Sequence, residues 1–279
     1  TCALPICDYV FTGDKIIDFE VPGTLGIIYN HKTWLNHKEK SYPFLDVRTY
    51  LSDAEKSEKL NVVYITLPDL SDNLISKLKD DKSVVLMIDT HNKHGMAEQR
   101  KLFIDLINNN CTTPIIIGRA YGDLTETQLQ LQAATDIGAL LIDGLGDGIF
   151  IAAERSGGDK MINETAFGIL QATRTRISKT EYISCPSCGR TLFDLQETTA
   201  KIRAVTSHLK GLKIGIMGCI VNGPGEMADA DYGYVGTGTG KITLYKEKNV
   251  VQRNIPEIEA VNSLIDLIKE HGDWIENKG

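Results

Sequence analysis

Short apolar runs alternate with longer amphipathic segments over the first part of the chain. Five runs, mostly rich in Val, Ile and Leu, predict buried strands: Asn61–Leu67, Ser83–Asp89, Thr113–Gly118, Ala139–Asp143 and Gly148–Ala152. Between them, Met96–Asn108 and Leu124–Ile137 carry apolar residues at helical spacing. Alternation of strands and helices predicts a parallel sheet with helices packed on it, either closed into a barrel or left open.

The segment 31–43, with the sequence HKTWLNHKEKSYP, is polar and interrupts this alternation. Its residues follow neither a helical nor a strand period. We therefore expect an irregular loop on the surface.

The pattern changes at about residue 178. Two short runs, Glu181–Ser184 and Leu212–Met217, predict strands. The segments Gly233–Gly236 and Ile242–Tyr245 predict a hairpin around glycine-rich turns. Strands and helices in this part do not alternate regularly, which favours an α+β arrangement.

Two helices complete the prediction for this part of the chain. One is expected to begin at Thr191, with Asp194 as its capping partner. The other is expected to begin at Pro256, to bury Ile258 among other apolar residues and to end at Gly272. The sequence thus predicts an α/β domain over residues 1–177, resembling a TIM barrel or a parallel sheet with helices, and a smaller α+β domain over residues 178–279.

The composition is typical of a soluble globular protein, since 42% of the 279 residues are apolar and 24% are charged. The formal net charge of −7 disfavours a general nucleic-acid binder, which usually presents a basic face. No run approaches the roughly 20 apolar residues of a membrane span. We therefore expect neither nucleic acid nor membrane as a partner.

The N-terminal segment and the cysteines together predict a cytoplasmic protein. Thr1–Cys7 has neither the charged region nor the apolar core of a signal peptide, and it lacks an initial Met, so we expect the chain to begin inside a longer protein. Six cysteines are present, at positions 2, 7, 111, 185, 188 and 219. A chain with so large a core needs no disulfides, which favours reduced thiols.

The strongest chemical signal is the sequence CPSCGR at residues 185–190. Cys185 and Cys188, three residues apart in a tight turn, can bind one metal centre. Arg190 and the helix expected to follow favour anionic thiolates. A third thiolate, Cys219, follows the strand predicted at Leu212–Met217, so the pattern indicates a metal site with at least three sulfur ligands.

The fourth ligand has two candidates. Cys111 belongs to the first predicted domain, whereas Glu226 lies seven residues after Cys219. We therefore favour Glu226. A carboxylate binds iron in a sulfide cluster less well than a thiolate does, so it could exchange with a substrate.

Spacing alone leaves iron–sulfur and zinc equally open. A structural zinc site would need four ligands, and the second predicted domain offers only His208 and His271 besides its three cysteines. A zinc-stabilised binding module on an α/β scaffold is therefore the alternative to a redox protein. A thioredoxin-like dithiol is disfavoured because the motif lies outside a thioredoxin-like context.

Three segments carry a resemblance to a known family: CPSCGRTLFDL at 185–195, MGCIVNGPGE at 217–226 and ADADYG at 228–233. Together they resemble the C-terminal domain of the 4-hydroxy-3-methylbut-2-enyl diphosphate synthase family. The resemblance extends over about residues 165–270.

The resemblance implies particular roles for five residues. In that family three cysteines and a glutamate hold a [4Fe–4S] cluster, which implies this role for Cys185, Cys188, Cys219 and Glu226. An asparagine near the family's cluster matches Asn222, which implies that Asn222 lies near the substrate. Glu226 and Asn222 are accordingly the expected catalytic residues.

The implied reaction belongs to the non-mevalonate isoprenoid pathway. It opens 2-C-methyl-D-erythritol 2,4-cyclodiphosphate reductively to 4-hydroxy-3-methylbut-2-enyl diphosphate, with ferredoxin or flavodoxin as electron donor. The residues before about 165 resemble the middle domain of the long, three-domain form of the family. The family's N-terminal barrel, which binds the diphosphate, has no counterpart in this sequence. We therefore expect this chain alone to be incomplete for catalysis and inactive.

Three other segments are better explained as turns or loops. Gly236–Lys241 fails the phosphate-loop pattern because a valine stands where its first glycine is required. Gly144–Gly148 is expected to form a turn, and Asp89–His94 a hydrogen-bonded loop.

Overall fold

This computed structural model describes residues 7–154 and 158–276. The chain divides into two compact units, the first ending at Arg176 and the second beginning at Ile177. None of the described helices is both long and apolar enough to cross a membrane.

The first unit contains a seven-stranded sheet. Its strands are β1 (Tyr9–Gly13), β2 (Gly26–Asn30), β3 (Ser41–Asp46), β4 (Asn61–Ile65), β5 (Val84–Ile88), β6 (Ile115–Tyr121) and β7 (Gly148–Ala153). Its helices are α1 (His31–Trp34), α2 (Val47–Leu51), the 3-10 turn η1 (Leu67–Asp69), α3 (Asp72–Asp80), α4 (Gly95–Asn108), α5 (Glu126–Ala133), the π-helical turn η2 (Ala134–Gly138), α6 (Ala139–Ile142) and α7 (Gly158–Ala172).

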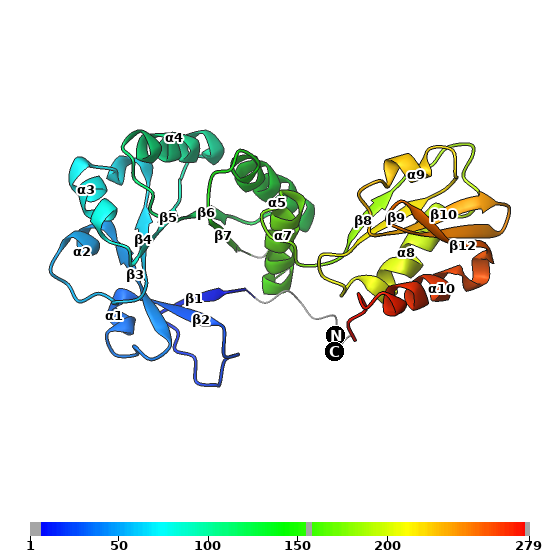
Figure 1. Cartoon of the computed structure of the whole chain (residues 1–279). Coiled ribbons are helices and arrows are strands. Elements are labelled where there is room, and N and C mark those ends of the chain that lie inside the picture. The colour runs from blue at the N-terminus through cyan, green and yellow to red at the C-terminus, as the bar shows by residue number, and fades with distance from the viewer. Residues whose placement is uncertain (1–6, 155–157, 277–279) are drawn as a thin grey trace. The chain divides into compact units, whose positions relative to one another are not determined.

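All seven strands are parallel and lie in the order of the chain, from β1 to β7. The sheet curls, and its helices lie along the outer side of the curl (Figure 1). Phe11 of β1 contacts Phe44 of β3 at 4.8 Å and Phe150 of β7 at 6.1 Å between ring centroids. Because β1 and β7 are the two ends of the sheet, these contacts show how far it curls. The predicted α/β fold is confirmed in its barrel-like form.

Both faces of this sheet are apolar. Val63, Leu86 and Ile117 point outward into the main core with the helices, whereas Val62 and Met87 belong to a second cluster on the inner face. A strand buried on both faces has an apolar residue at nearly every position. This explains why β4 to β7 could be located from uninterrupted apolar runs.

The strand predicted at Ala139–Asp143 is wrong. These residues form α6, which continues α5 and η2 without a break in the right-handed helical backbone. A run of consecutive apolar residues carries no period that distinguishes a strand from a buried helix. Leu140 and Leu141 are buried, whereas Ile142 is 73% exposed, as in an amphipathic helix.

The surface loop predicted at 31–43 is also wrong. Its first residues form α1, and its last three begin β3. Trp34 is only 3% exposed and donates its indole N–H to the carbonyl of Ser41 at 3.3 Å. The sequence analysis missed β1, β2 and β3 because none of them carries an uninterrupted Val, Ile and Leu run.

The second unit contains a five-stranded sheet. Its strands are β8 (Glu181–Ser184), β9 (Lys213–Met217), β10 (Tyr232–Gly238), β11 (Lys241–Lys246) and β12 (Asn249–Pro256), and its helices are α8 (Leu195–Thr206), α9 (Gly223–Glu226) and α10 (Glu257–Glu270). The strands β8, β9 and β10 are parallel, while β11 and β12 add to the sheet in antiparallel fashion. The expected smaller mixed domain and its hairpin, β10–β11, are confirmed.

Both faces of the second sheet are covered. On one face, Ile216, Tyr234 and Leu244 pack against α8 and α10. On the other, Met217 and Val235 pack against Met227, which follows α9. Figure 1 shows α8 and α10 on one side of this sheet and α9 on the other. The loop after β9 and the end of β8 therefore lie on the α9 side.

Two helix predictions in this unit need correction. Asp194 is itself the N-cap residue of α8, accepting the Glu197 N–H at 2.9 Å, so the helix begins one turn after Thr191. Ile258 is 90% exposed rather than buried, because the apolar side of α10 is formed by Ala260, Leu264 and Leu267. The predicted end is confirmed, with Gly272 at φ +78° just after the helix.

Candidate functional site

The five residues expected at the site line one pocket. The pocket has a volume of about 140 Å³ and lies where β8 and β9 end. Cys185, Cys188, Cys219, Asn222 and Glu226 all border it, together with Arg190. The carboxyl ends of adjacent parallel strands are a common place for ligand sites in sheets of this kind.

Cys185 is held by the backbone of the neighbouring strand. Its N–H donates to the carbonyl of Ile216 at 3.2 Å, which extends the pairing of β8 with β9 by one residue. Its Sγ accepts the N–H of Gly218 at 3.4 Å. The sulfur is half-buried, with its position set by the ends of two strands.

Cys188 lies in a tight turn that is closed by Thr191. The Cys188 N–H donates to Thr191 Oγ1 at 3.1 Å, and the Thr191 N–H donates to the Cys188 carbonyl at 3.0 Å. Ser187 has a left-handed backbone, with φ at +68°. This turn ends at Thr191, where a helix was expected to begin, and it leaves Cys188 exposed.

Arg190 makes the turn electrostatically favourable for a thiolate. The backbone N–H of Arg190, and then its side chain, hydrogen-bond Cys188 and lower the pKa of that thiol. The contact with Cys188, followed by the charges of Cys219 and Glu226, raises the pKa of Arg190. The guanidinium thus interacts with three of the acidic groups of the pocket.

The loop after β9 is packed tightly against this turn. The N–H of Leu192 donates to the carbonyl of Gly218 at 3.0 Å. A Cβ at Gly218 would lie 2.8 Å from Cγ2 and 2.9 Å from Oγ1 of Thr191, closer than side chains pack. A glycine is therefore required where the Cys219 loop meets the Cys188 turn.

Glu226 stands at the end of the one-turn helix α9. The Asn222 carbonyl accepts the N–H groups of Gly225 and Glu226, both at 3.0 Å. Both Asn222 and Glu226 are exposed toward the pocket opening. Their backbone is ordered by the helical turn, while their side chains stay free to meet a ligand.

Met227 anchors this short helix in the sheet. It is 1% exposed, and it fills a slot formed by Gly215 of β9 and Gly233 of β10, which are paired across the two strands. A Cβ at either glycine would come within 2.6 Å of a Met227 side-chain atom. Sequence analysis missed this support, because only the pairing of the two strands brings the glycines together.

The donors of the pocket do not converge on a single point. Among the described residues, no three side chains of His, Cys, Asp or Glu lie close enough together to hold one metal ion. Of the other cysteines, Cys111 is buried in the first unit beside Thr113, and Cys7 is free. Cys2, with residues 1–6 as a whole, lies outside the described residues.

Known proteins resemble this chain over the residues of the pocket and beyond them. Residues 181–270, which include the whole pocket, match the family model for the GcpE protein C-terminal domain. A 4-hydroxy-3-methylbut-2-en-1-yl diphosphate synthase (flavodoxin) of Parabacteroides distasonis is 47% identical over 277 residues, which are 98% of this chain and 44% of that protein. Over almost its whole length, the chain is thus similar to a part of this synthase.

Other members of the synthase family show the same relationship. The Bacteroides thetaiotaomicron synthase (flavodoxin) is 51% identical over 269 residues, covering 96% of this chain and 44% of that protein. The chloroplastic synthase (ferredoxin) of Arabidopsis thaliana is 55% identical over 179 residues, covering 63% of this chain and 24% of that protein. The chain thus spans less than half the length of the curated synthases it matches.

The other segments considered from the sequence form turns, a loop and a hairpin. In the Gly144–Gly148 turn, the Asp147 carboxylate accepts the N–H of Ile115 at 2.9 Å. In the loop after β5, the Thr90 hydroxyl accepts the N–H of Asn92 at 3.0 Å. The glycines at the end of β10 and in the turn after it belong to the β10–β11 hairpin. These three expectations are confirmed.

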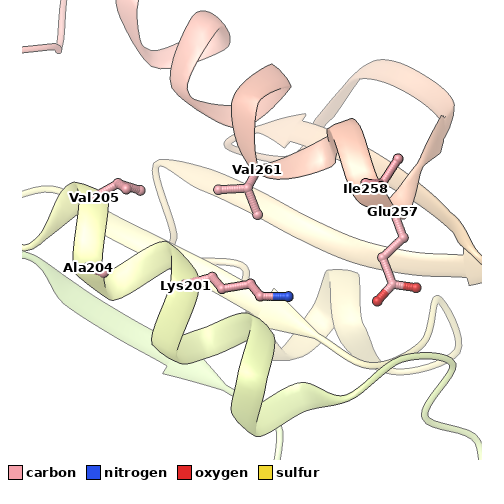
Figure 2. A pocket seen from close by; sticks show the side chains of 6 residues that line it. All are labelled: Lys201, Ala204, Val205, Glu257, Ile258 and Val261. Carbon is pink, nitrogen blue, oxygen red and sulfur yellow. The ribbon is translucent and has the colours of Figure 1, made fainter.

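A larger groove, of about 690 Å³, lies between α8 and α10. Figure 2 shows Lys201 and Glu257 extending toward each other across it, with apolar side chains along its sides. The groove contains no thiol or imidazole, and Lys201 already pairs with Glu197 at 2.7 Å. Sequence analysis missed this feature because it placed Ile258, which lines the groove, in the core.

Proposed function

We propose that this chain is part of an iron–sulfur reductase of the non-mevalonate isoprenoid pathway. The intact protein would convert 2-C-methyl-D-erythritol 2,4-cyclodiphosphate to 4-hydroxy-3-methylbut-2-enyl diphosphate. The conversion takes up two electrons and two protons and releases water. The observation that carries this proposal is the pocket shared by Cys185, Cys188, Cys219 and Glu226.

The residues of the pocket fit a [4Fe–4S] cluster. Such a cluster takes one protein ligand on each iron, so its ligands stand apart, whereas the four ligands of a zinc ion surround one atom. The spread of the four side chains around the pocket favours the cluster. Arg190 and the Gly218 N–H supply the positive charge and hydrogen bonding that anionic sulfur ligands need.

When bound, the cluster would supply Lewis acidity and electrons, one at a time. The residues of this chain hold and orient it. The Gly218 N–H fixes Cys185, the Thr191 hydroxyl fixes the turn that carries Cys188, and α9 presents Glu226 as an oxygen ligand that can exchange. The side-chain amide of Asn222, exposed beside Glu226, would bind and orient the substrate.

The remaining parts of the proposal concern partners. Relatives are named as flavodoxin-dependent or ferredoxin-dependent synthases, and we propose a donor of one of these two kinds for this chain. Arg190 is the only cation that lines the described pocket, so the residues that bind the diphosphate would come from the N-terminal barrel of the family. This chain alone would therefore be incomplete for catalysis. We also propose a cytoplasmic location, where thiols stay reduced.

We assign the two units different tasks. Residues 178–279 would form the [4Fe–4S] domain, and residues 1–177 would form a middle domain that acts as a spacer. The inner face of the first sheet supports the spacer role, because Ile28, Val62 and Met87 form an apolar cluster there.

The test is anaerobic purification followed by analysis for iron, sulfide and zinc together with a visible spectrum. About four irons and four sulfides per chain, with a broad absorption band in the blue, would support the reductase. One zinc and no sulfide, unchanged after anaerobic reconstitution, would instead support the zinc-stabilised binding module.

A further inference from the structure

Arg190 is the one cation among the residues that line the cysteine pocket, all of which lie in the described part of the chain. The same pocket contains three thiols and the Glu226 carboxylate. The guanidinium contacts Cys188 and interacts electrostatically with Cys219 and Glu226. One positive charge therefore shares the pocket with four groups that would be anionic as ligands, and it interacts with three of them.

The backbone that carries Arg190 is fixed on both sides. Before it, Cys188 exchanges two hydrogen bonds with Thr191, of 3.1 and 3.0 Å. After it, Leu192 donates to the carbonyl of Gly218, the residue that precedes Cys219. The guanidinium is exposed, but the backbone of Arg190 is held between the turn that bears Cys188 and the loop that bears Cys219.

A fixed cation at this place has a definite electrostatic consequence. A bound cluster becomes more negative by one charge when it is reduced, and a nearby positive charge stabilises the more negative state more strongly. Charge and hydrogen bonds close to the sulfurs are among the factors that set cluster potentials. Reduction by a given donor is therefore easier with the guanidinium present.

Building on the proposed function, we propose that Arg190 raises the reduction potential of the cluster by supplying a fixed positive charge at the pocket. The electron comes from the external reductant, and no bond to Arg190 forms or breaks. Arg190 acts here through its charge rather than as a ligand.

The test compares three variants of this chain: Arg190→Gln, Arg190→Lys and the control Arg253→Gln. Arg253 is exposed in β12, outside the pocket, so its replacement changes the net charge equally. After anaerobic reconstitution, iron and sulfide contents are measured, and the cluster is titrated with a reductant. We expect Arg190→Gln to lower the ratio of reduced to oxidised cluster at a fixed potential by about three- to tenfold, tenfold being about 59 mV for one electron.

Arg190→Lys should retain most of the wild-type potential, and Arg253→Gln should retain all of it. If Arg190→Gln takes up a full complement of iron and sulfide and its midpoint potential is unchanged, the inference about Arg190 is overturned. The proposed function would stand. If Arg190→Gln fails to load, recovery of loading in Arg190→Lys would support a charge role, and failure of both would contradict it. A wild-type chain that takes up no iron and sulfide would overturn the proposed function.

A second measurement, on the cluster-free chain, distinguishes failure of the Arg190 inference from failure of the proposed function. Iodoacetate is anionic and iodoacetamide is neutral, so the ratio of their alkylation rates at Cys188 reports the local field independently of the thiolate fraction. We expect Arg190→Gln to lower this ratio several-fold and Arg253→Gln to leave it unchanged. An unchanged ratio in Arg190→Gln would show that the guanidinium does not act on the pocket.

Discussion

The N–H of Gly218 donates a hydrogen bond to the Sγ of Cys185 over 3.4 Å. This contact joins the first residue after β8 to the first residue after β9, and therefore couples two of the segments that bear cysteines. The same glycine lies against Thr191, which closes the turn of Cys188. Gly218 thus holds Cys185 directly, and it contacts Thr191, the residue that holds Cys188.

Replacing Gly218 with alanine should disturb this arrangement. The added Cβ would lie 2.8 Å from Thr191 Cγ2, so the turn of Cys188 must move. We expect a loss of stability of about 1–3 kcal/mol, together with several-fold lower iron and sulfide uptake. Thermal unfolding and metal analysis would measure the two effects. The matched control is Gly225→Ala in α9, where nothing lies within 4 Å of an added Cβ; equal behaviour of the two variants would contradict the prediction.

Replacing Glu226 with alanine should separate cluster binding from catalysis. Glu226 is exposed at the pocket, and its side chain has no hydrogen-bond partner among the described residues. We expect the variant to keep most of the cluster absorbance, while the full-length enzyme loses activity by roughly 100-fold. Asp229→Ala, which removes an exposed carboxylate three residues later, is the control. Complete loss of the cluster in Glu226→Ala would contradict the role of Glu226 as an exchangeable ligand.

Changes in the first unit should leave catalysis intact. His91 is exposed, and Asp147 serves to hold the backbone of Ile115. We expect His91→Ala to keep the kcat of the full-length enzyme within about twofold. Asp147→Asn should lower stability by about 1 kcal/mol with a similar kcat. A large kinetic loss in a well-folded variant would contradict the spacer role.

Breaking the ion pair of Arg119 with Asp136 should strongly destabilise the first unit. The Arg119 side chain is 5% exposed and meets the Asp136 carboxylate at 2.9 Å, while also donating to the carbonyls of Thr90 and Asn92. Arg119→Met would leave these buried acceptors unpaired, so we expect a loss of about 3–5 kcal/mol. Urea denaturation followed by Trp34 fluorescence, in a Trp274→Phe background, would measure it.

The control for this prediction is Arg100→Met. Arg100 pairs with Asp143, and both side chains are more than one-third exposed, at 35% and 49%. Exposed pairs of this kind contribute at most about 1 kcal/mol. Comparable losses in the two variants would refute the special importance of the buried pair.

The acid sensitivity of the second unit should depend on Asp273. Hydrogen bonds from Tyr232 and then Lys246 lower the pKa of this carboxyl. Its stabilising effect is therefore complete above the unfolded-state pKa of about 3.9 and is lost as the pH falls through the lower folded-state pKa. We expect Asp273→Asn to cost about 1 kcal/mol at neutral pH, a modest value because the pair is partly exposed.

This difference from wild type should shrink as the pH falls below about 4. Denaturation curves at several pH values, followed by Trp274 fluorescence, would reveal it. Asp266→Asn, an exposed position on α10, should show no such convergence. A constant difference at all pH values would argue against the charge of Asp273 as the cause.

The candidate site was largely visible in the sequence, because its ligands carry their own chemical signature. A thiol or a carboxylate at a particular spacing can be recognised before the fold is known. Its mechanical supports could not be recognised in this way. The slot that holds Met227 requires Gly215 and Gly233 to face each other, and nothing in either segment reveals that β9 and β10 pair in that register.

Errors in predicting the fold have an equally specific origin. The strands β4 to β7 were found because both of their faces are buried. The apolar run that contains Leu140 and Leu141 looks the same in the sequence but forms the helix α6. Only the continuation of α5 into α6 shows that this run is helical. The strand β12 was missed because it is a mostly exposed strand at the end of its sheet.

In both sheets, neighbouring strands are also consecutive along the chain. Each strand can thus pair with one that the ribosome has already released, and no later segment has to be inserted between two earlier strands. Each addition closes only the connection between two successive strands, so the entropic cost of each step stays limited. We expect both units to assemble during translation, one strand at a time from the amino end, with the Cys219 loop arriving on a β8 edge that has already formed.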